Sequence, residues 1–115
     1  MEELFALLDE IGYPYFRQGS MSDKDYKPEF FTYWNIDTTN DSFYDNNETR
    51  YIEYIQVGLY TNNARSVYTL MDDFIERAKN RGFVIVGRPQ DANADKTEYF
   101  GRVCYLRKIN KIQGE

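Results

Sequence analysis

Histidine is absent from this sequence of 115 residues, and Cys104 is the one cysteine. Zinc and related metals are held mainly by histidine and cysteine at set spacings, so this composition argues against a transition-metal site. Histidine is also the usual base that activates a serine or cysteine nucleophile. We therefore expect no catalytic residues, no metal and no cofactor, and a protein that is not an enzyme.

Long apolar segments are missing as well. No run approaches the roughly 18 residues of a membrane-spanning helix. The chain begins with two glutamates, where a secretory signal peptide would carry positive charge. A single cysteine without an intramolecular partner suits a reducing compartment. The expectation is a soluble protein that is neither secreted nor attached to a membrane.

Clustered glycines, which a phosphate-binding loop needs ahead of a helix, are not found. The seven glycines are dispersed along the chain, so nucleotide binding has no support. Gly58 and Gly101 fall within predicted strands, where glycine marks either a bulge or the close approach of another backbone. The bulge is the favoured interpretation, and a gap facing a neighbouring subunit is the alternative.

The acidic residues are the remaining candidates for metal binding or acid–base catalysis. The acidic and amide side chains between Asp41 and Glu48 suit calcium in type, but their spacing does not match an EF-hand, and a solvated turn is favoured. Asp72 and Asp73 occupy adjacent helical positions that point to different sides. Asp91 and Asp95 fall in a predicted loop with nothing to anchor them. An enzyme that uses paired carboxylates is therefore the least favoured class.

Basic residues are outnumbered. The 14 lysines and arginines face 19 acidic residues, for a net charge of -5, which opposes nonspecific attachment to nucleic acid or an anionic membrane. A basic cluster near the C-terminal end is interpreted as a solvated strand edge, because clustered positive charge keeps sheet edges from pairing. The cluster consists of Arg102, Arg107, Lys108 and Lys111.

Aromatic residues are abundant, at 17%, and eleven of them are tyrosines. A tyrosine ring covers a large area while its hydroxyl finds a partner or water, which suits half-exposed sheet faces and protein interfaces. High β propensity alone explains the enrichment equally well. Both interpretations stay open at this stage.

Two helices are predicted. Residues 2–11 carry leucines at helical spacing, with acids in the first turn and Gly12 as a stop. A second helix, capped by Asn62 or Asn63, runs to Asn80 with one apolar stripe, and Gly82 ends it.

The rest of the chain favours short strands separated by polar loops. The strand at 51–61 alternates most clearly, with Tyr54 and Tyr60 on one face and Ile55, Val57 and Leu59 on the other. A short extended piece is expected at 13–16, and further strands at 30–36, 83–86 and 97–108. The pattern of 30–36 leaves open which of its faces is buried. Loops are expected at 17–28 and 88–96, a turn or long hairpin connection at 37–50, and a frayed tail at 109–115. The predicted fold is a single α+β domain over 1–115, a mostly antiparallel sheet with two helices packed on one face.

Several short segments follow one another in an order that is typical of one protein family. They are a helix ending in glycine, Tyr13-Pro14-Tyr15-Phe16, the aromatic strand Phe31 to Trp34, an Asp45-Asn46 pair, Tyr54 to Tyr60, Gly82-Phe83, and an acidic loop closing with Asp95, Thr97 and Tyr99. In this order the chain resembles the tail-completion proteins of long-tailed bacteriophages and prophages, of the tail-terminator or head-to-tail joining type. Phe100 departs from the family, many of whose members have a polar residue or histidine there.

The resemblance implies a structural role. Such proteins close the tail tube at its head-proximal end, typically as a hexameric ring, and contact both the tail-tube protein and a head-completion or connector protein. Assembly would occur in the bacterial host cytoplasm, and the protein would lie in the tail or neck of the virion. DNA would pass through an acidic ring without specific binding.

A ring subunit needs two different adhesive patches, because its interfaces are heterologous. The candidates are the three predicted loops and the exposed side chains of the aromatic strands. By residue, the expected interface positions are Trp34, Phe43, Tyr44, Tyr54, Tyr60, Asp91 and Asp95.

The alternative is a stand-alone acidic binding protein, such as an inhibitor or an immunity-like factor, which engages a basic partner. The two hypotheses differ in assembly. A ring former associates with itself or with tail-tube protein, whereas an inhibitor stays monomeric and forms a stoichiometric complex.

Overall fold

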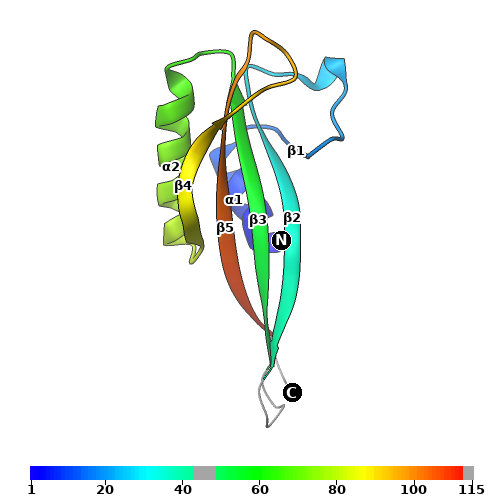
Figure 1. The fold of residues 1–115 in the computed structure, drawn as a ribbon, viewed down its shortest axis with the longest axis vertical. Helices are drawn as coiled ribbons and strands as arrows, with labels where there is room; N and C mark the ends of the chain where they lie inside the picture. Colours follow the sequence, from blue (N-terminus) through cyan, green and yellow to red (C-terminus); the bar gives the residue numbers. More distant parts are fainter. Residues whose placement is uncertain (43–48, 113–115) are drawn as a thin grey trace.

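A computed structural model describes residues 1–42 and 49–112. It has two α-helices and a five-stranded sheet of order β1-β2-β3-β5-β4, in which only the β1–β2 pair is parallel (Figure 1). The predicted α+β class with a mostly antiparallel sheet is confirmed. The elements are α1 Glu2–Ile11, β1 Tyr15–Arg17, a 3-10 turn Asp23–Asp25, β2 Glu29–Ser42, β3 Thr49–Thr61, α2 Ser66–Asn80, β4 Val84–Ala92 and β5 Phe100–Ile112.

Helix α1 has the bounds that its leucine spacing predicts. It ends at Gly12, whose φ of 95° lies in the left-handed region and whose N–H donates to the Leu8 carbonyl at 3.0 Å. A residue with a Cβ would be strained at this φ, so glycine makes a sharp end here. The leucines of α1 are fully buried.

Helix α2 begins at Ser66, later than its sequence pattern predicts. The Asn63 side chain accepts hydrogen bonds from the N–H groups of Arg65 and Ser66, at 3.0 and 3.3 Å, and so shapes the turn before the helix. Gly82, with a φ of 90°, follows the last turn as expected. Within the described residues, both helices are too short and too polar to cross a lipid bilayer.

The two helices pack on the same face of the sheet, where the core lies. Phe31 of β2 packs against Phe74 of α2 with ring centres 5.3 Å apart. The burial of Phe31 shows that the helix side of β2 carries Phe31 and Tyr33, a point that the sequence left open. The core side chains of β3 and β5 come from alternate positions: Ile55, Val57, Leu59, Cys104 and Leu106.

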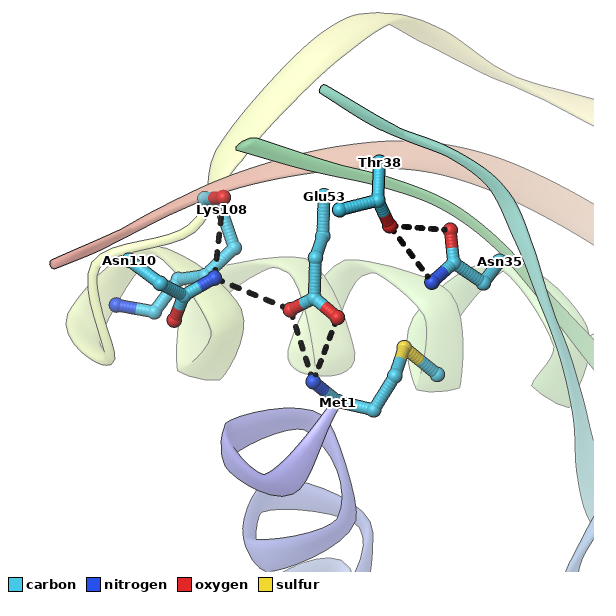
Figure 2. Close-up of polar contacts among 6 residues, drawn as sticks. All are labelled: Met1, Asn35, Thr38, Glu53, Lys108 and Asn110. Carbon is cyan, nitrogen blue, oxygen red and sulfur yellow. Dashed lines mark hydrogen bonds and ion pairs between the residues drawn. The ribbon is translucent and has the colours of Figure 1, made fainter. Parts of the chain in front are cut away.

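A buried carboxylate joins the start of α1 to the sheet. Glu53 of β3 is 6% exposed, and its two oxygens lie 2.8 and 2.9 Å from the N-terminal ammonium group of Met1. Asn110 of β5 donates a third hydrogen bond to Glu53 at 3.1 Å (Figure 2). The buried charge is thereby paired and hydrogen-bonded, as a charge of low exposure requires.

The hairpin connection predicted over 37–50 is wrong in its bounds. β2 and β3 are paired antiparallel from Glu29 with Thr61 to Ser42 with Thr49, so only residues 43–48, which lie outside the described residues, separate them. One irregularity falls between Asn35 and Asp37. Residues 37–42 lie in a strand because pairing with β3 outweighs the low strand propensity of Asp and Asn.

The limits of the last two strands also differ from expectation. β4 runs to Ala92, so half of the loop predicted at 88–96 is strand. Gly87, with a φ of 73°, and Pro89 are tolerated because β4 is an edge strand whose pairing is interrupted between Val86 and Gln90. β5 begins at Phe100 rather than at 97, and it continues to Ile112, where a frayed tail was expected.

Three strands extend beyond the part of the sheet that the helices cover (Figure 1). β1 pairs only with β2 residues 31–33, and β4 pairs with no β5 residue beyond Arg107. Residues 37–42 of β2, 49–54 of β3 and 108–112 of β5 therefore form a narrow three-stranded ribbon. This ribbon lengthens the molecule to 53 Å along its main axis.

Candidate interaction surface

The sheet face opposite the helices carries most of the exposed large apolar side chains among the described residues. Two adjacent rows of side chains cross it, each with one residue from β2, β3, β5 and β4. The rows are Trp34, Gln56, Tyr105 and Val86, then Asp37, Tyr54, Arg107 and Val84.

Large apolar side chains on this face are left in contact with solvent. The exposed fractions are 39% for Trp34, 48% for Ile36, 42% for Val84, 46% for Val86 and 43% for Ile109. Contiguous apolar patches are uncommon on soluble monomers and mark sites of protein contact. We call this surface the open face, defined by Trp34, Ile36, Tyr54, Val84, Val86, Tyr105 and Ile109.

Two of the predicted interface residues lie on the open face. Trp34 stands beside Arg17, whose guanidinium carbon is 4.7 Å from the ring centre, a cation–π contact at the edge of the sheet. Tyr54 lines a shallow hollow together with Ile36, Val86 and Tyr105. The alternation of the strand patterns predicts Trp34 and Tyr54, but the neighbours that complete the patch come from β4 and β5.

Arg107 lies in the middle of this surface rather than on the solvated edge that the basic cluster suggested. β5 is flanked by β3 and β4 at this point. The Nε atom of Arg107 is buried and has no hydrogen-bond partner among the described residues. A buried donor without an acceptor costs free energy, so an acceptor brought by a partner would relieve it.

Tyr60 is also on this side of the sheet, but its ring packs within the molecule. It stacks on Phe30 with ring centres 5.3 Å apart and lies across Gly58 and Gly101. A Cβ on Gly101 would lie 2.7 Å from the Cδ1 atom of Tyr60. Burial raises the pKa of the Tyr60 hydroxyl, and the charge of Asp95 adds to this.

The bulge interpretation of the two glycines is therefore wrong. The β3–β5 pairing runs through Gly58 and Gly101 without a shift in register. The glycines leave room for the Tyr60 ring instead, because any larger residue would occupy its place. No repeating pattern in the sequence shows this relation, since Tyr60 and Gly101 are neighbours only across strands.

Two of the predicted loops lie together at one end of the sheet. Tyr26 and Tyr99 meet edge to face at 5.3 Å, and the Tyr99 hydroxyl donates to the Lys27 carbonyl at 2.9 Å. Lys96 lies 4.7 Å above the Tyr26 ring. A cavity of about 250 Å³, lined in part by Asp95, separates these loops above Tyr60. Tyr26 and Tyr99 hold these segments together; the sequence did not single out Tyr26, and it pointed to Tyr99 only as part of the order of motifs.

The two predicted acidic positions have different surroundings. Asp91 accepts hydrogen bonds from Tyr68 at 3.1 Å and from Arg102 at 2.7 Å, so its charge is engaged within the subunit. Asp95 is exposed on the loop after β4. Phe43 and Tyr44, the other two predicted positions, lie outside the described residues.

The described residues also show where reactive groups lie. Burial raises the pKa of the Cys104 thiol to about 12, so the thiol stays protonated and shielded in the core. Within residues 1–42 and 49–112, no three acidic or cysteine side chains gather closely enough to hold a metal ion. Most of the calcium-type loop, Asp45 to Glu48, lies outside the described residues.

A comparison with known proteins found no matching family model and no curated protein of similar sequence. What the protein does is therefore inferred from the open face, the paired loops and the order of the sequence motifs.

Proposed function

We propose that this protein is a structural subunit of a phage or prophage tail, which caps the tail tube as a ring and joins the tail to the head. The open face carries the proposal, because it leaves five large apolar side chains more than a third exposed on an ordered sheet. Such a surface suits a subunit whose partner is another folded protein. The order of motifs that the chain shares with tail-completion proteins supports this kind of assembly, a ring at the end of a tail tube.

The open face and the loop end of the molecule are two different surfaces, and a ring with heterologous contacts requires two such patches on each subunit. The open face is apolar and aromatic, whereas the loop end is polar around Lys96 and Asp95. A net charge of -5 suits a ring through which DNA passes, since repulsion keeps the phosphate backbone moving. No catalytic residue, cofactor or membrane is part of this proposal.

Mass measurement in solution tests the proposal directly. The purified protein is measured alone and after mixing with the tail-tube protein encoded by the same genome. We expect either a ring-sized oligomer or co-assembly at the end of tail tubes, visible by electron microscopy. A strict monomer that ignores tail tubes and forms a stoichiometric complex with a basic protein would favour the inhibitor or immunity-like alternative instead.

A further inference from the structure

The ribbon has two unpaired edges. In the described residues, β1 pairs with β2 only as far as Tyr33, so the outer edge of β2 is open from Asn35 to Ser42. On the opposite side, β4 pairs with β5 only as far as Arg107, which leaves the outer edge of β5 open from Lys108 to Ile112. Open strand edges present unpaired N–H and C=O groups that bind another strand.

The remaining edges are blocked. The outer edge of β2 at residues 31–33 is paired with β1. β4 contains Gly87 and Pro89, and its pairing with β5 is interrupted between Val86 and Gln90. Bulges and prolines are common means of preventing strand addition. The open stretch of β2 contains no proline, lysine or arginine. The ribbon edge of β2 is thus open to another strand, whereas Lys108 and Lys111 on the ribbon edge of β5 oppose pairing except with an acidic strand.

The two edge strands carry opposite charge. The open stretch of β2 contains Asp37 and Asp41 and no basic residue, whereas the open stretch of β5 contains Lys108 and Lys111 and no acidic residue. Like charges on facing strands are destabilising, and opposite charges are favourable. Pairing of β2 with β2, or of β5 with β5, is therefore opposed, and pairing of β2 with β5 is favoured.

The directions of the strands are compatible with the pairing of β2 in one copy with β5 in another. β2 and β5 both run antiparallel to β3, so they are parallel to each other within one subunit. A second copy related by rotation about an axis along the strands places its β2 beside β5 of the first copy, in parallel. In such a rotation, the register of the sheet places Thr38 to Ser42 of one copy level with Lys108 to Ile112 of the next, and the open faces of the two copies adjoin.

We propose that copies of this chain associate head to tail, by pairing the acidic edge of β2 in one copy with the basic edge of β5 in the next. The contact is heterologous, so repetition closes into a ring or runs on as a filament. This inference rests on the proposed ring function and specifies the interface that such a ring uses.

Charge reversal tests the pairing. Asp37→Lys and Lys108→Glu are measured by sedimentation velocity over a concentration series, alone and with tail-tube protein. We expect each single variant to associate about tenfold more weakly than the original chain, because each replaces an attractive charge by a repulsive one where an acidic edge meets a basic edge. An equimolar mixture of the two variants, and the double variant, should regain the original affinity to within about threefold, because each restores opposite charges across the contact.

Glu76→Lys and Lys79→Glu serve as matched controls, because both residues are exposed on α2. They should leave association unchanged, and thermal unfolding should show that every variant is folded. Stronger association of Asp37→Lys with the original chain than of the original chain with itself would indicate β2–β2 pairing and overturn the proposal.

Two failures are distinguishable. If the original chain assembles and neither charge variant weakens the assembly, the edge pairing is wrong while the ring function stands. If the original chain assembles neither alone nor on tail tubes, the ring function and the edge pairing are both wrong.

Discussion

The ring of Tyr60 illustrates how one residue organises two strands. It fills the space above Gly58 and Gly101 and stacks on Phe30, so it replaces the side chains that these glycines lack. An aromatic ring over a cross-strand glycine covers backbone that would otherwise contact water. Tyr60 therefore contributes to the stability of the subunit, and its packing leaves less of the ring for an external partner.

Gly101→Ala should lower the free energy of unfolding by about 1–3 kcal/mol, because the new Cβ would overlap Tyr60 and lie 3.0 Å from the Ala92 carbonyl oxygen. Urea unfolding followed by circular dichroism measures the loss. In a background of Tyr60→Ala, the same substitution should cost less than half as much, since the ring is gone. Equal costs in both backgrounds would contradict the proposed overlap.

The two helices are joined at their surface as well as through the core. Glu10 of α1 accepts from Arg81 at 2.7 Å and from Arg77 at 3.2 Å, both on the C-terminal side of α2. The hydrogen bond from Arg81 is the main cause that lowers the pKa of Glu10 below its usual 4.5. The groups are solvent-exposed, so the link is weakened by salt.

Glu10→Gln should lower the thermal midpoint slightly at neutral pH and low salt. A carboxyl whose pKa is lower in the folded state stabilises that state above its unfolded pKa, and this contribution is lost as the pH falls. The difference in midpoint between Glu10→Gln and the original chain should therefore shrink below pH 4.5. Glu76→Gln, a change on an exposed helix position, should show no such pH dependence in differential scanning calorimetry.

At the scale of the whole molecule, helices cover one face of the sheet and leave the other face exposed to solvent. The chain has a single tryptophan, Trp34, and it stands on the open face. Its fluorescence therefore reports on that face without labelling. Burial of the indole in a dry contact shifts its emission to shorter wavelength.

Binding of a partner to the open face should shift the emission of Trp34 to the blue, and Trp34→Ala should weaken that binding at least about tenfold, as expected of an aromatic anchor in an interface. The free energy of unfolding of the subunit should also fall, by about 1–2 kcal/mol, because the side chain is only 39% exposed and its ring contacts Arg17. Thermal unfolding should show that the variant is still folded. Tyr68→Ala, which removes an exposed aromatic ring from α2, is the control. Unchanged binding by Trp34→Ala would place the interface elsewhere on the molecule.

The amino-acid sequence alone determined the elements whose pattern is local. The leucine spacing of residues 2–11, with Gly12 behind it, set the bounds of α1, and strict alternation over 51–61 separated the buried face of β3 from the side of Tyr54 and Tyr60. The same alternation placed Tyr54 among the candidate interface residues, whereas the structure decided that Trp34 faces away from the core. Such patterns depend only on the periods of helix and strand.

Tertiary structure decided what depends on pairing between distant segments. The extension of β2 to Ser42 and β5 to Ile112, the packing of Tyr60 on Gly101, and the central position of Arg107 all follow from cross-strand register. Residues that face each other on neighbouring strands can lie dozens of positions apart in the chain, and no local periodicity shows which residues pair. The open face and the two charged edges are therefore visible only once the strands are paired.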